Sequence, residues 1–118
     1  MTRLPRSVKV GVHTYKVVAD KSRIDALSVA SGAVDVRLGE CDTHSLTITL
    51  DPTQARTMAQ ETLLHECLHA CWSLIGASED VNDAVEERLT LRLAPVLLEM
   101  LRRNPALVAY LTDEHTDA

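Results

Sequence analysis

Apolar and polar residues alternate through the first half of the chain. In VKVGVHTYKVV, residues 8–18, valines alternate with polar or small residues, and the pattern breaks near residues 13–14 before it resumes. A period of two predicts strands with one buried face, here joined by a turn into a hairpin. A second hairpin is predicted within residues 34–50, where every second residue of LTITL is apolar. The segment between the hairpins has no clear period.

The second half of the chain has the pattern of helices. A helix is predicted to begin at Asp51, which precedes a first-turn proline, or one turn later. It should end at Gly76, because glycine commonly terminates helices. A further helix follows, for which Ser78, Asp80 and Asn82 are candidate N-terminal caps.

This further helix, AVEERLTLRLAPVLLEMLRR, contains Pro95. Proline lacks a backbone N–H, which predicts a kink or a break just before it. A short last helix, ALVAYL, is predicted after Asn104 and Pro105. The apolar stripe that we expect to face the protein interior comprises Val85, Leu89, Leu93, Val96, Leu97 and Met100.

Composition limits the class of protein. The 118 residues suffice for one domain, predicted to cover residues 1–111, and the acidic residues 112–118 are expected to form a mobile tail. With no Phe, one Trp and two Tyr, the core must be aliphatic. The net charge of −5 is accompanied by no basic block, which argues against nucleic acid or an anionic membrane as a partner. No apolar run is long enough to span a bilayer.

The cysteines indicate a reducing compartment. Cys41, Cys67 and Cys71 are an odd number without the spacing of a disulfide framework, and the N-terminus lacks the pattern of a signal peptide. A cytoplasmic location is therefore expected. Cys67 and Cys71, four residues apart on a predicted helix, are interpreted as small apolar core residues.

One short segment carries residues suited to chemistry. In ETLLHECLHACW, residues 61–72, His65 and His69 are four residues apart, and Glu66 follows the first of them. Residues four apart share one face of a helix, so both imidazoles can bind the same metal ion. Glu66 is rotated by about 100° from His65, beside the metal, where it can act as a general base. The pattern predicts a catalytic Zn²⁺ site.

A catalytic zinc needs a third protein ligand and one open position. Glu86 falls within the apolar stripe that we expect to face inward, and Glu87 falls outside it. A carboxylate on an inward face is costly unless it is paired or bound to a metal. We therefore predict that Glu86 joins His65 and His69 as the third ligand. Glu87 is the alternative ligand, and a salt bridge to Arg92 is the alternative role of Glu86.

The segments TLLHECLHACW and VEERLTLRLAPVLLEMLRRNPALVAYL resemble the small HExxH metallopeptidase-like proteins common in bacteriophage genomes. More distantly, the chain is similar to the SprT-like and ImmA/IrrE-like minimal gluzincins. The resemblance covers about residues 8–111 and is sharpest over residues 62–97. It implies an α+β fold, in which a small antiparallel sheet of N-terminal hairpins packs on the HExxH helix and a following glutamate-bearing helix.

By this resemblance the ligands of the zinc are His65, His69 and Glu86, and Glu66 is the catalytic acid-base. The substrate would be a peptide or protein. The hairpin beside the motif helix corresponds to residues 45–50, whose edge would hold an extended peptide by strand addition. The resemblance also implies a phage or prophage origin and therefore the cytoplasm of the host cell.

Two functions agree with these features. A zinc-dependent metallopeptidase accounts for the carboxylate of Glu66, which a purely structural site does not need. A zinc-stabilised regulatory or structural binding module without peptidase activity agrees with the small size of the chain. A peptidase also needs a group that stabilises the oxyanion, for which Tyr15, Arg92 and Tyr110 are candidates. Thr90 is a candidate brace for the third ligand, and the sequence leaves the oligomeric state open.

Overall fold

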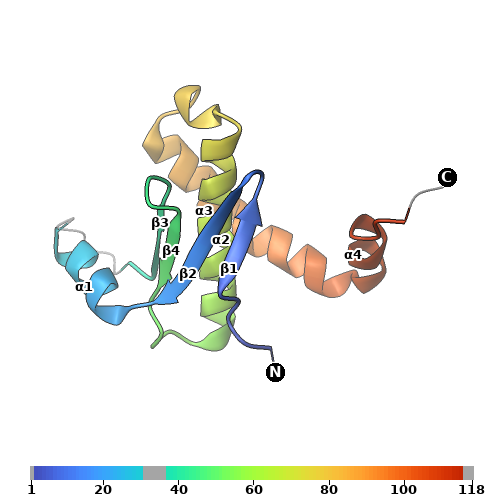
Figure 1. Ribbon diagram of the computed structural model, residues 1–118, viewed down its shortest axis with the longest axis horizontal. Coiled ribbons are helices and arrows are strands. Elements are labelled where there is room, and N and C mark those ends of the chain that lie inside the picture. Colours follow the sequence, from blue (N-terminus) through green and yellow to red (C-terminus); the bar gives the residue numbers. More distant parts are fainter. Residues whose placement is uncertain (1, 31–36, 116–118) are drawn as a thin grey trace.

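The computed structural model describes residues 2–30 and 37–115. The described strands all lie in the first half of the chain, together with α1, and the second half is helical, which confirms the α+β class (Figure 1). Within the described ranges the elements in chain order are β1 (Ser7–Val10), β2 (His13–Ala19), α1 (Lys21–Ala30), β3 (Gly39–Asp42), β4 (Thr47–Leu50), α2 (Arg56–Leu74), the short 3₁₀ helix η1 (Ala77–Glu79), α3 (Asp83–Arg103) and α4 (Pro105–Leu111).

β1 and β2 form the first predicted hairpin. They pair antiparallel, with Val8 opposite Tyr15. The turn contains Gly11 at φ 60°, a left-handed conformation that glycine adopts at little cost. His13 already pairs with Val10 and begins β2. The turn therefore lies before His13, and the prediction of a turn near residues 13–14 is wrong.

The second predicted hairpin, β3 and β4, joins the first one by a parallel pairing. The strand order is β1-β2-β4-β3, with β4 antiparallel to β3 and parallel to β2. The expected antiparallel sheet is therefore a mixed sheet. After β2 the chain passes through α1 to the far edge of the sheet at β3, and then turns back into β4. Alternation predicts strands and their buried faces, but it does not specify which strands become neighbours.

This strand order places β4 inside the sheet. Ile48 pairs with Val17 of β2 on one side and with Cys41 of β3 on the other. An extended peptide therefore cannot add at residues 45–50, and that prediction is wrong. Among the described strands the edges are β1 and β3, both of which contact α2.

One face of the sheet packs on α2, as predicted. The buried cluster between them is aliphatic apart from one tyrosine, in agreement with the composition, and it comprises Val10, Tyr15, Val17, Ile48, Leu50 and Ala70. Cys67 packs against this cluster as a small apolar residue should, whereas Cys71 is exposed. The alternating strand residues therefore provide one side of the core, and one face of the motif helix provides the other.

The ends of α2 follow from local chemistry. The carboxylate of Asp51 accepts hydrogen bonds from the backbone N–H and the hydroxyl of Thr53, at 2.8 and 2.7 Å, and so stabilises a turn instead of a helix start. The helix begins at Arg56, the later of the two predicted positions. It ends before Gly76, which adopts φ 72° as a helix-terminating glycine.

α3 is continuous over Asp83–Arg103, and the predicted break at Pro95 is wrong. The N–H that Pro95 lacks would have bonded the carbonyl of Leu91. Because Leu91 is exposed, water can replace this donor. At the helix start, Asn82 is the cap among the three candidates, since its side chain accepts a hydrogen bond from the Val85 N–H at 2.9 Å.

The buried face of α3 differs from the predicted apolar stripe. Thr90 and Ala94 are fully buried, with 0% exposure each. Most of the predicted stripe is exposed, namely Leu89, Leu93, Val96 and Met100. The helix carries apolar residues on more than one side, and periodicity alone does not show which side packs within the chain.

α4 ends at Leu111, the predicted limit of the domain. Residues 112–115 are exposed, and residues 116–118 of the expected tail lie outside the described residues. Within the described part of the chain, no helix combines the length and the apolar character needed to cross a bilayer.

Candidate metal centre

His65 and His69 lie on the face of α2 that meets α3. Their rings lie edge to face with centroids 4.9 Å apart. The two Nε2 atoms approach each other to 3.2 Å. Both side chains are largely buried, with exposed fractions of 14% and 17%. The four-residue spacing on the helix thus brings two imidazole nitrogens to one point.

Glu87 joins the two histidines in a cluster. One of its carboxylate oxygens lies 2.9 Å from Nε2 of His65, and the other lies 2.7 Å from Nε2 of His69. One donor atom from each of the three residues lies within 4.8 Å of the other two. We call this group the His–Glu cluster (His65, His69 and Glu87). Since the Glu87 side chain is 55% exposed, the cluster opens to solvent on that side.

Glu86 lies at the opposite edge of the His69 ring. Its Oε2 atom is 2.7 Å from Nδ1 of His69, and its side chain is only 13% exposed. It faces inward as predicted, but it is not directed at the point where the two Nε2 atoms meet. The structure places the alternative residue, Glu87, at that point. The helical wheel favoured the more buried of the two acids, whereas the structure brings the more exposed one to the two Nε2 atoms.

The pKa values of the two histidines are shifted in opposite directions. Burial alone would lower the pKa of His69, but the carboxylates of Glu86, Glu66 and Glu87 outweigh it and raise the pKa. Burial lowers the pKa of His65, and the opposing effect of Glu87 does not compensate for it. His69 is therefore the histidine at which the surrounding carboxylates stabilise positive charge.

Glu66 lies on the sheet side of the cluster. It is 7% exposed, and its pKa is raised to about 7, chiefly because burial penalises the charged carboxylate. His69 lowers this pKa and Glu87 raises it, so the carboxylate interacts electrostatically with the His–Glu cluster. Gly39 of β3 packs closely against it: a Cβ atom there would lie 3.1 Å from Oε2 of Glu66. No group in the described ranges donates a hydrogen bond to the Glu66 carboxylate.

Thr90 fixes the two helices that carry the site. Its hydroxyl donates to the backbone carbonyl of Glu86 at 2.7 Å and accepts a hydrogen bond from the indole N–H of Trp72 at 3.0 Å. The hydroxyl therefore links α2 to the turn of α3 that bears Glu86 and Glu87. Thr90 was predicted to brace the side chain of the third ligand; it bonds instead to the backbone carbonyl of Glu86.

The three candidates for oxyanion stabilisation lie elsewhere. Tyr15 belongs to the core, Tyr110 is 81% exposed on α4, and Arg92 is exposed on α3. Within the described residues, none of them makes a hydrogen bond or an ion pair with the His–Glu cluster. Arg37, which sequence reasoning missed, has a charge that lowers the pKa of Glu66 against the larger effect of burial. The only indication of this role in the sequence is that Arg37 is a basic residue two positions before β3.

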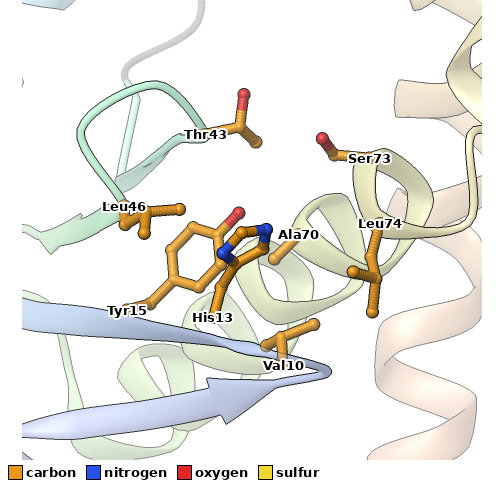
Figure 2. A pocket seen from close by; sticks show the side chains of 8 residues that line it. All are labelled: Val10, His13, Tyr15, Thr43, Leu46, Ala70, Ser73 and Leu74. Carbon is orange, nitrogen blue, oxygen red and sulfur yellow. The ribbon is translucent and has the colours of Figure 1, made fainter.

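A separate cavity of about 150 Å³ lies on the sheet side of α2 (Figure 2). The β1–β2 and β3–β4 hairpins and the C-terminal part of α2 enclose it. Its polar lining consists of His13 and Tyr15 from β2, Thr43 from the β3–β4 turn and Ser73 from α2. The His–Glu cluster lies on the face of α2 toward α3, so this cavity is not part of the candidate metal centre.

Comparisons with protein-family models, with curated proteins and with solved structures find no match to the chain.

Proposed function

We propose that the protein is a zinc-dependent metallopeptidase. In this proposal the zinc ligands are His65, His69 and Glu87, and Glu66 is the general base. The observation that supports it most is the meeting of two imidazole nitrogens and one carboxylate at the protein surface. Two histidines and one glutamate with an open fourth position are typical of catalytic zinc, whereas structural zinc is closed by four protein ligands.

The dimensions of the His–Glu cluster fit a tetrahedral ion. Zn–N bonds of about 2.0–2.1 Å in tetrahedral geometry separate two nitrogens by roughly 3.4 Å. The two Nε2 atoms of His65 and His69 are 3.2 Å apart. Glu87 lies slightly closer to them than a ligand would, so its exposed side chain would have to move outward to admit the ion. Glu86 accepts a hydrogen bond at Nδ1 of His69, which leaves Nε2 available as a donor to the metal.

Bound zinc would supply Lewis acidity, which lowers the pKa of water and polarises the carbonyl of the peptide bond. The chain itself contributes the proton transfer. Glu66, with a pKa of about 7, accepts a proton from the attacking water and delivers it to the leaving amine nitrogen. The water oxygen bonds to the carbonyl carbon while the C–N bond breaks, and the second proton of the water also passes to the leaving nitrogen, so the products are a carboxylate and a protonated amine.

The free edge of β3 is the proposed site for the peptide backbone. In the described sheet β3 has one neighbour, β4, so its other edge is available for strand addition. Gly39 in β3 lies against Glu66, so a peptide paired with this strand would pass beside the general base. Residues 39–42 therefore replace residues 45–50 as the proposed peptide-binding strand.

A zinc-stabilised binding module is the second candidate. It is favoured by the exposed apolar residues of α3 and α4, which are more numerous than catalysis requires. The two candidates differ in their dependence on Glu66. A peptidase requires this carboxylate for turnover, whereas a binding module requires only the metal ligands.

The test combines metal analysis with a peptidase assay. Purified protein should contain one zinc per chain by elemental analysis and should hydrolyse casein or quenched fluorescent peptides. Glu66→Gln should keep its zinc and lose roughly 10²–10⁴-fold in kcat, the usual contribution of a general base. Glu79→Gln, a change of an exposed acid on η1, is the matched control and should retain activity. Zinc binding without any hydrolysis would support the binding module, and a chain that binds no zinc would overturn both candidates.

A further inference from the structure

Four apolar residues of α3 form an exposed line along the helix. We call them the α3 stripe (Leu89, Leu93, Val96 and Met100); their exposed fractions are 44, 48, 66 and 45%. Their spacing of four, three and four residues is that of the seam of a two-helix pair. At about 100° per residue, the stripe lies roughly a quarter turn or more from the buried face at Thr90 and Ala94. The stripe is therefore a second apolar face, which residues 2–30 and 37–115 leave exposed.

α4 continues the exposed apolar surface. It has seven residues, none of them buried. Leu107, Tyr110 and Leu111 are 37, 81 and 64% exposed. Figure 1 shows that α4 and the end of α3 extend away from the sheet and α2. A helix this short is marginal in water without tertiary contacts. We call α4 and the end of α3 the arm, and packing against a partner would stabilise it.

We propose that the α3 stripe is the interface of a homodimer, in which the α3 helices of two copies pack antiparallel about a two-fold axis. The axis would pass between Leu93 and Val96. Leu93 of one copy then packs near Val96 of the other, and Leu89 packs near Met100. A two-fold interface is self-complementary. The spacing of the stripe, four, three and four residues, is the same in both directions along the helix, so it meets this requirement.

The charges beside the stripe favour the antiparallel arrangement. Arg92 and Glu99 are seven residues apart, so they lie on the same flank of the helix, on the side away from the buried face. An antiparallel pair places Arg92 of each copy near Glu99 of the other. In a parallel pair the Arg92 and Glu99 side chains of the two copies would lie on opposite flanks and would not meet. Both side chains are exposed; Glu99 pairs with Arg103 within the chain at 3.0 Å, and it has a second oxygen for another partner.

The exposed area agrees with a dimer. Seven apolar side chains of the α3 stripe and of α4 are each 37–81% exposed, which is on the order of several hundred Å² of apolar surface. Each partner in an interface of standard size contributes roughly 800 Å². The stripe and the arm together therefore offer an area of the order that a stable pair requires.

The test is the mass of the full-length protein in solution. Sedimentation equilibrium or light scattering at about 1–100 µM should give 26.0 kDa, twice the chain mass of 13.0 kDa. Val96→Glu should give a monomer with unchanged helical circular dichroism. Leu91→Glu is the matched control, because Leu91 is equally apolar and 59% exposed but lies on the opposite side of α3. It should remain a dimer.

The charge pair gives a second, independent readout. Arg92→Glu should raise the dimer dissociation constant at least several-fold, and adding Glu99→Arg should restore it, because the exchange re-forms the pair. A monomeric wild type over the whole concentration range overturns the proposal, as does equal dissociation of the Val96→Glu and Leu91→Glu proteins. Failure of the charge exchange to restore the dimer overturns the antiparallel arrangement. None of these results depends on zinc or on peptidase activity.

Discussion

Glu86 holds His69 by a contact of 2.7 Å between its Oε2 atom and Nδ1 of the imidazole. A carboxylate at Nδ1 keeps the proton on that nitrogen, so that Nε2 is the nitrogen that could give up its proton and bind a metal ion. On the next position of α3, Glu87 meets this Nε2 atom, also at 2.7 Å. Two adjacent acids thus act on opposite edges of one ring. In the proposed zinc site, Glu86 would position His69 and Glu87 would be a ligand.

This division of roles predicts unequal effects on zinc affinity. Glu87→Gln replaces a carboxylate ligand by a weak amide donor, and the zinc dissociation constant should rise by more than 100-fold. Glu86→Gln keeps an oxygen that can accept from Nδ1–H, so the loss should be at most the roughly 10–100-fold typical of groups that support a ligand. Competition with a chromogenic chelator measures both constants. A larger loss in Glu86→Gln than in Glu87→Gln would restore Glu86 as the third ligand.

The sequence could place part of this site and not the rest. The spacing of His65 and His69 is sufficient for their convergence, because both lie on one regular helix and the geometry is local. Glu86 and Glu87 belong to another helix, and the choice between them depends on how α3 crosses α2. The relative orientation of these two helices cannot be predicted from a local sequence pattern. The helical wheel correctly predicted that Glu86 faces inward. Its carboxylate, however, contacts Nδ1 of His69 and not the Nε2 atoms where the two histidines meet.

The fold shows the same limit. Alternation predicted both hairpins, Gly76 was correctly predicted to end a helix, and Asn82 is the cap among three predicted candidates. The position of β4 inside the sheet was not predictable from its own residues, since a strand edge becomes an inner position only through a partner distant in sequence. The prediction that the residues of the α3 stripe face the protein interior was wrong for a related reason. Periodicity identifies an apolar face, but it does not show whether that face packs within the same chain.

The hydroxyl of Thr90 should be worth a measurable part of the stability. Thr90→Val keeps the shape and the β-branch but leaves the indole N–H of Trp72 without its acceptor. Since Thr90 is fully buried, the free energy of unfolding should fall by about 1–3 kcal/mol. Urea denaturation followed by Trp72 fluorescence measures this. Thr90→Ser, which retains the hydroxyl and loses only a methyl group, is the control. A Val variant as stable as the Ser variant would mean that the link between α2 and α3 contributes nothing.

The absence of a side chain at Gly39 should be required for the approach of β3 to α2. A Cβ atom there would lie 2.7 Å from Cγ2 of Thr62 and 3.1 Å from Oε2 of Glu66. Gly39→Ala should therefore lower the free energy of unfolding by about 1–3 kcal/mol, as overpacking of a core typically does. Any peptidase activity should fall with it, because Glu66 must move.

Thr62→Ser provides the matched rescue for this change. Serine lacks Cγ2 but keeps the hydroxyl that donates to Gln54 at 2.9 Å. The double variant Gly39→Ala/Thr62→Ser should recover part of the lost stability, with a favourable coupling energy in a double-mutant cycle. Additive effects of the two changes would show that the clash with Thr62 is not the source of the loss.

The buried carboxylate of Glu66 should make the stability of chelator-treated protein depend on pH. Its pKa in the folded chain is about 7, against an ordinary value of 4.5. Below pH 4.5 both states are protonated, and between 4.5 and 7 only the folded state keeps the proton. The preference for the folded state is therefore greatest at low pH and is lost as the pH rises through 7. The full shift corresponds to at most about 3 kcal/mol.

Glu66→Gln removes this titration and nearly conserves the shape of the side chain. Relative to wild type, the variant should gain about 2–3 kcal/mol of unfolding free energy between pH 5 and pH 8, as measured by urea denaturation at each pH. Histidines titrate in both proteins, so the comparison between the two proteins largely removes their contribution. A difference that does not change with pH would place the Glu66 carboxylate in a solvated setting. Its role as a base with a pKa near neutrality would then have no physical basis.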